Sequence, residues 1–479
     1  MSELKKKIAQ NFLISFGGRF IAGAIGIVSV ALITRTIGTD GFGAYSTVLA
    51  FLYIFSVCAD FGLHPLLARE IAKQDTDEAA TISSIFSTRV LLLFASILLS
   101  FSVVAFMPYS SAVKWGVVIA ALGFVFQSLS GVLMGVFQKH LKTGIPALAD
   151  ISARTLQLAA AAYLFYAGGT FLHFLFIFTL GGAVQLCIVY ASVRRQIPFR
   201  LVFHAKALVR TLKESWPMAV SAILVLVYFK GDTLLLSLLR APHEVGVYGV
   251  AYKILENIIF FPIMFVGLVM PLLSKYFTAD IEMFRAVFQK TFDFLAIIVV
   301  PLAAGGIYCA PALIRILAGS GFEEAALPLR ILLIAVVFIF FGALFGSTII
   351  AIHEQKKVMW VYGSAAALNI AANFYLISRY SYIGAAATTA ATELVVSSCM
   401  LFIIYRTTRH LPRIGALVKA CGAAAVMVAA LIVSPSQSFF FLIALGAFVY
   451  AGMLYALRGI TQEDLRVLRQ IMRFSRENA

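Results

Sequence analysis

The stretch NFLISFGGRFIAGAIGIVSVALIT, residues 11–34, decides the fold class of this chain. It exceeds the ~20 apolar residues that carry a helix across ~30 Å of hydrocarbon, and its only charged residue is Arg19. Lys5, Lys6 and Lys7 precede it, as in a signal peptide, but the apolar core of a signal peptide has only about 7–15 residues. We therefore expect a retained membrane span whose flanking lysines lie in the cytoplasm.

The composition extends this interpretation to the whole chain. Of its 479 residues, 61% are hydrophobic and 13% are charged, whereas a soluble domain is about 45–50% apolar and about 25% charged. The net charge of +16 would suit a nucleic-acid-binding protein, but the basic residues are spread over short loops between apolar stretches. We expect a polytopic membrane protein that contacts membrane lipids and no nucleic acid.

Fourteen apolar stretches are long enough to cross a membrane as helices. They are 10–34, 42–63, 82–107, 113–135, 148–167, 170–192, 214–238, 246–273, 289–318, 325–351, 358–378, 382–406, 414–434 and 438–457. Only Gly168-Gly169 separates the fifth from the sixth, so one long re-entrant hairpin is an alternative there.

The basic residues indicate the orientation of these spans. With fourteen spans and a cytoplasmic start, the outer loops hold only Arg35, Lys114, Arg240, Arg315, Arg330 and Arg379. The other basic residues outside the spans fall in cytoplasmic loops and at the two ends, as the positive-inside rule requires. The sequence therefore predicts cytoplasmic N- and C-termini.

The longest loop divides the chain into two halves. We expect an N-lobe at 1–192, an amphipathic cytoplasmic linker at 193–213, a C-lobe at 214–406, two extra spans at 407–457 and an amphipathic cytoplasmic tail at 458–479. In the linker and the tail, apolar residues recur at helical spacing between basic ones, a pattern typical of helices that lie on a membrane surface.

A weak internal repeat supports this division. Phe42-Gly43-Ala44-Tyr45 opens the second span, Val245-Gly246-Val247-Tyr248 opens the eighth, and each follows a short outer loop that carries an Arg. Repeated halves are typical of secondary transporters, whose substrate site lies between the halves near the midplane.

Charged side chains inside the spans are the candidates for function, because an ionisable group in hydrocarbon costs at least ~2.5–3.5 kcal/mol. The first half offers Arg19, Arg89 and Arg154, with Gln157 at i+3 from the last, and span seven adds Lys230. Because arginine makes bidentate contacts with phosphate oxygens, this set predicts a substrate site for a bulky anion. The alternative for Arg89 and Arg154 is that their long side chains reach the headgroups instead.

The second half carries more acids at depth. Asp232 lies past the middle of span seven, Glu393 lies near the centre of span twelve, and Asn369 and Asn373 share one face of span eleven. Glu393 has no basic residue three or four positions away, so it could bind and release a proton. We take these four residues as ion-coupling candidates, the alternative for Glu393 being a protonated side chain in helix packing.

Other chemistry has little support in the sequence. Lys253 and Glu256 are spaced i, i+3 and predict a structural ion pair. The five cysteines lie singly and the seven histidines are scattered, so we expect neither disulfides nor a metal site. There is no P-loop, GxSxG motif or large external loop. We therefore expect a non-enzyme without a bound cofactor, driven by a proton or sodium gradient.

Several motifs point to one family. In the first half they are Thr34-Arg35, Ile37-Gly38-Thr39-Asp40-Gly41-Phe42-Gly43-Ala44-Tyr45, Asp60-Phe61-Gly62-Leu63 and Arg69-Glu70-Ile71-Ala72. In the second half they are Asp232 with its Leu run, Gly246-Val247-Tyr248, Ala251-Tyr252-Lys253 and Pro271-Leu272-Leu273-Ser274. With these motifs the chain resembles the oligosaccharide flippases of the polysaccharide biosynthesis family (Wzx type).

The resemblance implies the fold of the multidrug/oligosaccharidyl-lipid/polysaccharide (MOP) exporters, an all-α, MATE-like arrangement of about 14 helices in two pseudo-symmetric lobes around a central cavity. It implies ion-coupled, alternating-access translocation of an undecaprenyl-pyrophosphate-linked oligosaccharide across the bacterial cytoplasmic membrane. The cargo would be a repeat unit of O-antigen, capsule or exopolysaccharide, with a polysaccharide polymerase and chain-length machinery as partners.

Three alternatives stay open. A lipid II flippase would carry a closely similar substrate, and a MATE-type drug or cation antiporter would use an acidic cavity that the second half could supply. A membrane glycosyltransferase or polymerase would be expected to place catalytic residues on a sizeable external loop.

Overall fold

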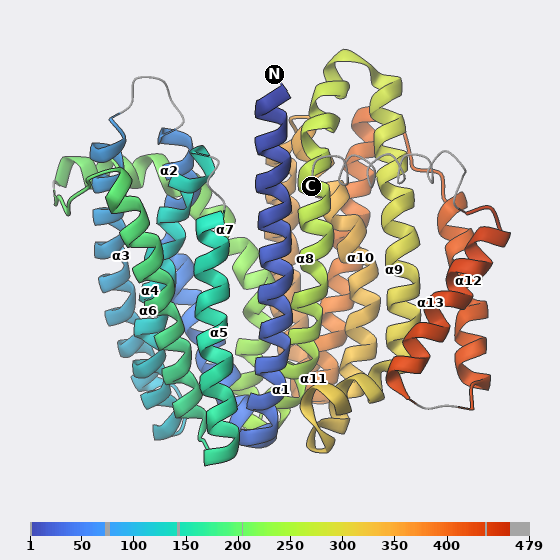
Figure 1. Ribbon diagram of the computed structural model, residues 1–479, viewed down its shortest axis with the longest axis horizontal. Coiled ribbons are helices and arrows are strands. Elements are labelled where there is room, and N and C mark those ends of the chain that lie inside the picture. The colour runs from blue at the N-terminus through green and yellow to red at the C-terminus, as the bar shows by residue number, and fades with distance from the viewer. Residues whose placement is uncertain (1, 72–76, 141–143, 204, 436–437, 460–479) are drawn as a thin grey trace. The chain divides into compact units, whose positions relative to one another are not determined.

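The computed structural model describes residues 2–71, 77–140, 144–203, 205–435 and 438–459. The described residues form helices joined by short connections, and none of them lies in a β-strand (Figure 1). The all-helical class expected from the sequence is therefore confirmed.

Thirteen α-helices and one 3-10 helix follow one another in these residues. They are α1 (Ser2–Asp60), α2 (Leu63–Ile71), α3 (Glu78–Phe106), α4 (Ser111–Lys139), α5 (Gly144–Ala167), α6 (Phe171–Gln196), α7 (Ala205–Leu239), α8 (Pro242–Ala279), α9 (Ile281–Ala318), η1 (Ser320–Ala325), α10 (Ala326–Ala351), α11 (Gln355–Thr408), α12 (Gly415–Val433) and α13 (Phe439–Ala456).

Two of the helices contain a kink where the sequence predicts a loop between two spans. In α1 the backbone of Gly38 has φ 64° and ψ −171°, and in α11 that of Ser381 has φ 51° and ψ −133°. A positive φ costs glycine little, whereas it strains serine. Each kink therefore separates two predicted spans inside what is otherwise one continuous helix.

The fifth and sixth predicted spans are two separate helices. α5 ends at Ala167, Gly168 has φ 78°, and α6 begins at Phe171. At 1.5 Å per residue, helices of 24 and 26 residues are each roughly 36–39 Å long, which is enough to cross the hydrocarbon.

Ten helical segments of the described residues are long and apolar enough to cross a membrane, so this is a multi-pass membrane protein. Two of them, Gly17–Ile71 and Gln355–Thr408, are 55 and 54 residues long and contain the kinks. The expected number of fourteen crossings and the two-lobe arrangement stay predictions.

The chain forms two compact units. Unit 1 comprises Met1–Val250, Arg315–Glu323 and Tyr362–Ala385, and unit 2 comprises Ala251–Ile314, Glu324–Val361 and Ala386–Ala479. Most of the predicted site residues lie in unit 1, while Lys253, Glu256 and Glu393 lie in unit 2.

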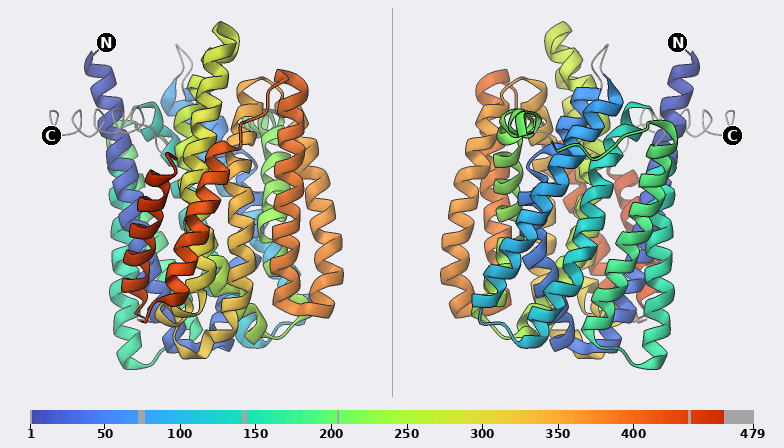
Figure 2. Two further views of the ribbon diagram at one scale, coloured as in Figure 1. Left: turned by 90° about the vertical axis from the view of Figure 1, so that its right-hand side faces the viewer. Right: turned by 90° about the vertical axis from the view of Figure 1, so that its left-hand side faces the viewer.

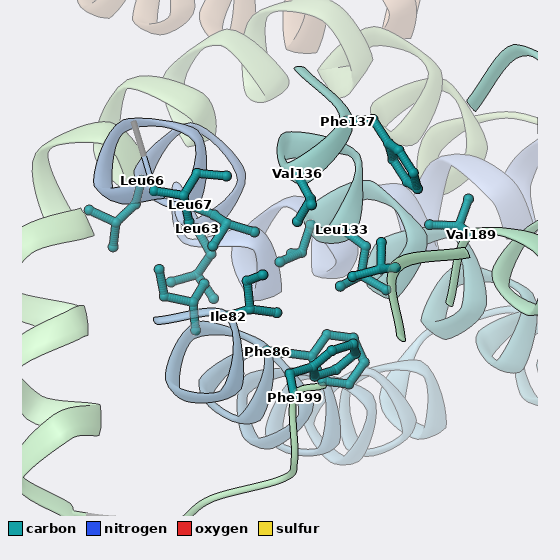
Figure 3. Packing of buried hydrophobic residues seen from close by; sticks show 14 of the residues in the cluster. Leu63, Leu66, Leu67, Ile82, Phe86, Leu133, Val136, Phe137, Val189 and Phe199 are labelled. Atoms are coloured by element: carbon teal, nitrogen blue, oxygen red, sulfur yellow. The ribbon is translucent and has the colours of Figure 1, made fainter. Parts of the chain in front are cut away.

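Unit 1 has an apolar core where α2 packs on α3 and α4. Figure 3 shows Leu63 and Leu67 of α2 facing Ile82 of α3 and Val136 of α4, and all four side chains are at most 3% exposed. The right-hand view of Figure 2 shows α4, α5 and α6 running side by side in the same unit. The short α2 is thus anchored by its apolar face, which fixes the end of α1 before it.

The connection from α6 to α7 is tied to α3 by its backbone. The amide of Arg200 donates to the Ser83 hydroxyl at 3.0 Å, and that of Val202 donates to the Ser87 hydroxyl at 2.8 Å. Phe199 is buried against this helix as well. The linker expected at 193–213 thus begins within α6, continues through this anchored strip and ends within α7, while the tail at 460–479 lies outside the described residues.

Unit 2 is held by aromatic packing and by hydrogen bonds that join its helices. The Tyr450 hydroxyl donates to the Ile297 carbonyl at 2.8 Å, which connects α13 to α9, and the Tyr308 hydroxyl donates to the Leu431 carbonyl at 2.9 Å, which connects α9 to α12. The left-hand view of Figure 2 shows α12 and α13 as a neighbouring pair.

Candidate functional site

Arg89 of α3, a predicted substrate contact, lies beside an acid at the end of α1. Its Nη1 is 2.8 Å from Asp60 Oδ1, and the side chains are 4% and 26% exposed. A cation near a helix C-terminus also interacts favourably with the helix dipole. The charge of Arg89 is therefore compensated inside unit 1, a role that competes with the predicted contact to a substrate.

Arg154 of α5 has a more open setting. Its Nε donates to Asp150 Oδ1 at 3.1 Å, one turn earlier, and 40% of its side chain is exposed. Its guanidinium passes so close to Gly26 of α1 that a Cβ there would lie 2.8 Å from Nη1. Glycine at this position leaves room for the guanidinium between the two helices.

Gln157, at i+3 from Arg154 on α5, reaches toward the neighbouring helix α6. Its amide nitrogen lies 3.5 Å from the Phe178 carbonyl of α6, and Gly181 leaves the space that the amide occupies. The side chain therefore contributes to the contact between α5 and α6, and its role beside Arg154 at a substrate site stays a prediction.

Arg19 is an exposed residue of α1, the helix that meets α5 at Gly26 and Arg154. Gly18 packs against Ala147, while Gly26 packs against Arg154, so α1 and α5 run parallel. Arg19 and Gly26 are seven residues apart, which puts Arg19 roughly 10 Å along the helix from the guanidinium of Arg154. Arg19 and Arg154 are thus both more accessible than Arg89.

α7 carries a cation and an anion two residues apart. Lys230 Nζ lies 5.7 Å from the centre of the Tyr53 ring, within range of a cation–π contact. Asp232 is only 2% exposed, and its Oδ1 accepts the Thr233 amide at 2.6 Å. Its Oδ2 accepts a hydrogen bond from the Tyr248 hydroxyl of α8.

Two arginines of the predicted repeat bind carbonyl groups near helix ends. Arg35 Nη2 donates to the Ile316 carbonyl at 2.7 Å, near the end of α9. Arg240 donates to the carbonyls of Ile377 at 3.1 Å and Ser378 at 2.6 Å, just before the kink in α11. Both contacts place a cation at the negative end of a helix dipole.

The Arg240 contact is a common reference point from which the depths of two ion-coupling candidates can be compared. Asp232 lies eight residues before Arg240 in α7, and Asn369 lies eight residues before Ile377 in α11, so each is roughly 12 Å from the contact. Asn369 and Asn373 are 2% and 0% exposed, and the Asn373 amide donates to Asn369 Oδ1 at 2.8 Å. Three of the four candidates are thus buried within unit 1, with Asp232 and Asn369 at similar depth.

The two repeat motifs meet through their glycines. A Cβ on Gly43 would lie 1.8 Å from the Pro242 carbonyl oxygen, and one on Gly246 would lie 2.1 Å from the Thr39 carbonyl oxygen. Each carbonyl belongs to the residue four positions before the other glycine, so the contact is reciprocal. His243 Nδ1 adds a 2.9 Å hydrogen bond to the Thr39 hydroxyl. We call this contact the glycine crossing.

The predicted residues of unit 2 have separate settings. The ion pair expected in α8 is present, with Lys253 Nζ 2.9 Å from Glu256 Oε2. Glu393 of α11 is buried, with 6% of the residue exposed. No cluster of three or more His, Cys, Asp or Glu that could hold a metal ion occurs among the described residues.

Sequence reasoning missed two groups. It included neither Asp60 nor Asp150 among the candidate site residues, although the i, i+4 spacing of Asp150 and Arg154 already signals a pair. It also read Tyr248 only as a repeat marker, although a buried tyrosine hydroxyl requires a hydrogen-bond partner.

The comparisons with known proteins agree with this fold. The family model described as polysaccharide biosynthesis protein matches residues 8–277, and the MatE model matches residues 217–375. The "Putative O-antigen transporter" of Shigella flexneri is 24% identical over 409 residues, which cover 79% of this chain and 93% of that protein.

Among solved structures, the lipid II flippase MurJ in an inward closed conformation has a TM-score of 0.77 at 15% identity, with 92% of this chain and 98% of that chain covered. An inward-facing MATE transporter of the MOP superfamily has a TM-score of 0.66 at 12% identity, with 83% and 99% covered. These likenesses show a shared fold. Because the first family model spans more than half of the chain, the chain belongs to the polysaccharide biosynthesis protein family.

Proposed function

We propose that this protein is a flippase that moves an undecaprenyl-pyrophosphate-linked oligosaccharide, a repeat unit of a surface polysaccharide, across the bacterial cytoplasmic membrane by alternating access. The observation that carries the proposal is the family match over residues 8–277, together with the O-antigen transporter that aligns over 93% of its own length. The expectation of a non-enzyme fits these transporter relatives.

The chemistry of the substrate explains why such a protein keeps arginines in its membrane helices. A pyrophosphate and a glycan are strongly hydrated and cannot enter hydrocarbon, so basic and polar groups must replace their water. Arg19 and Arg154 suit this task best among the predicted arginines, because they are more exposed than Arg89 and lie on neighbouring helices. Guanidinium groups offer paired donors that match phosphate oxygens.

The remaining predicted substrate contacts have less support. Arg89 is 4% exposed and ion-paired, so we assign it first to the stability of unit 1. Lys230 lies at the Tyr53 ring, where its ammonium is near α1. Gln157 serves helix packing.

We assign ion coupling to Asp232, Asn369 and Asn373, with Glu393 as a separate candidate in unit 2. A carboxylate and amide oxygens buried in one unit are suitable ligands for sodium, and a carboxylate alone suffices for a proton. Dissipation of the sodium or proton gradient should then slow transport, and Asp232→Asn should make it insensitive to the gradient.

Complementation tests the proposed function. A strain that lacks its O-antigen flippase receives the wild-type protein, Arg19→Ala, Arg154→Ala or the control Arg194→Ala, which changes an exposed arginine at the end of α6. We expect surface polysaccharide with the wild type and the control and a strong loss with the other two variants, at equal membrane abundance. Full activity of both variants would exclude the two arginines as pyrophosphate contacts, and failure of an abundant wild type would argue against the substrate.

A lipid II flippase is the second candidate, because the structural likeness to MurJ has the higher of the two TM-scores. Rescue of a strain depleted of its lipid II flippase, without rescue of surface polysaccharide, would favour this alternative.

A further inference from the structure

Tyr248 of α8 contacts a buried acid that the proposed function uses. Tyr248 is 0% exposed and Asp232 is 2% exposed, and the tyrosine hydroxyl donates to Asp232 Oδ2. Asp232 Oδ1 accepts the Thr233 amide at 2.6 Å and the Thr233 hydroxyl at 3.3 Å. Both oxygens of this carboxylate are therefore served by donors from the chain itself.

These donors compete with any cation that binds the same carboxylate. A buried carboxylate is stabilised by each hydrogen bond that it accepts, more strongly than a neutral acceptor would be. A proton or a sodium ion that binds Oδ2 competes with the hydrogen of the Tyr248 hydroxyl for the electron density of that oxygen. The hydroxyl therefore lowers the cation affinity of Asp232 for as long as it stays in place.

The place of the hydroxyl depends on the glycine crossing. Tyr248 follows Gly246 by two residues, and Gly246 is in backbone contact with Thr39 of α1. The start of α8 is also tied to α1 by His243, which lies 2.9 Å from the Thr39 hydroxyl. A shift of α8 along or away from α1 at this point carries the phenol ring with it and withdraws its hydroxyl from Asp232.

We infer that Tyr248 is a positioning residue that couples the glycine crossing to cation binding at Asp232. While the crossing is closed, the Tyr248 hydroxyl satisfies the carboxylate and keeps its cation affinity low. When the crossing opens, the hydroxyl leaves and the cation binds more tightly. This inference rests on the ion coupling that the proposed function assigns to Asp232.

The repeat provides a matched control. Tyr45 occupies the position in Phe42-Gly43-Ala44-Tyr45 that Tyr248 occupies in the second motif. Its ring stacks on Phe42 with centroids 5.9 Å apart, and its hydroxyl forms no hydrogen bond with any residue in the described part of the chain. Tyr45→Phe removes the same atom from the other motif without touching a carboxylate.

The test measures cation binding by the purified full chain in detergent, without lipid-linked substrate. The unfolding temperature is followed against sodium at fixed pH, with choline as the control cation, and against pH without sodium. The relevant ion is the one whose effect Asp232→Asn abolishes. Tyr248→Phe is expected to lower the half-saturating concentration of that ion about tenfold, because a hydrogen bond to a charged group is lost.

Two further variants complete the test. Thr233→Val removes the longer of the two hydrogen bonds to Asp232 Oδ1. It is expected to lower the half-saturating ion concentration as well, by a smaller factor. This variant keeps the inference testable if Tyr248→Phe does not fold. Tyr45→Phe is expected to leave it unchanged. An unchanged or weakened cation affinity in folded Tyr248→Phe would overturn the inference. It would also be overturned if sodium and protons stabilise Asp232→Asn as much as they stabilise the wild type. Because no oligosaccharide is present, neither result depends on whether the protein is a flippase.

Discussion

The glycine crossing should be intolerant of a single added methyl group. Gly246→Ala would place a Cβ 2.1 Å from the Thr39 carbonyl oxygen, and Gly43→Ala would place one 1.8 Å from that of Pro242. Cβ atoms essentially never approach other atoms within 3.0 Å, so α1 and α8 would have to separate by about 0.9 Å and about 1.2 Å respectively. Neither obstacle can rotate away, because both are backbone atoms in helices.

The cost follows from two opposing effects. Overpacking of this kind costs about 1–3 kcal/mol, whereas replacing glycine by alanine inside a helix gains about 0.5–1 kcal/mol. We expect each variant to lose about 1–2 kcal/mol of unfolding free energy. The double variant should lose less than the sum, because the first substitution already separates the helices.

The assay is thermal unfolding in detergent micelles, with Gly131→Ala as the control. Gly131 is also in the interior of a helix, α4, but a Cβ there would meet nothing within 4 Å. The control should therefore be as stable as the wild type or slightly more stable. If Gly246→Ala and Gly131→Ala unfold at the same temperature, the reciprocal contact of the two motifs does not exist as described.

Three other predictions concern single charged groups. Asp60→Asn should cost about 3 kcal/mol of unfolding free energy, because it leaves Arg89 buried without its partner, and adding Arg89→Met should restore much of that loss in the same unfolding assay. Asp150→Asn should change the unfolding free energy by no more than about 1 kcal/mol, because the side chains of its pair with Arg154 are 31% and 40% exposed; a larger loss would show that the pair is structural. Burial and two neighbouring arginines hold the pKa of His410, in the connection before α12, below its ordinary value of 6.5. As the pH falls below 6.5, the unfolded chain takes up this proton before the folded chain does, so the unfolding temperature should fall, and His410→Gln should remove that part of the decline.

The membrane class and the positions of the helices could be predicted from the sequence, because apolar stretches of this length have few other stable arrangements. The resemblance motifs identified the family that the comparisons show. Both kinks lie at boundaries between predicted spans. Their conformations could not be predicted equally well, because glycine at position 38 accepts a positive φ, whereas Ser381 adopts one although its residue type argues against it.

The pairing of charges could not be predicted in the same way. Arg89 and Asp60 are far apart in sequence and meet only because α1 and α3 pack together, so depth alone made Arg89 look like an open cation. Gln157 shows the same limit, because helical spacing alone does not reveal that its amide contacts the Phe178 carbonyl of α6. Spacing within a helix predicts which residues are neighbours on that helix. Which residues of other helices a side chain contacts depends on the helix that packs against it.

Translocation by the purified protein tests the central claim most directly. The protein is reconstituted into vesicles that contain a fluorescent undecaprenyl-pyrophosphate-linked oligosaccharide, and a membrane-impermeant quencher reports the fraction in the outer leaflet after an ion gradient is applied. We predict that the wild type moves the labelled lipid between leaflets, that Arg154→Ala moves it much more slowly, and that protein-free vesicles do not move it. Equal transfer in vesicles with and without the folded protein would contradict the assignment as a lipid-linked oligosaccharide flippase.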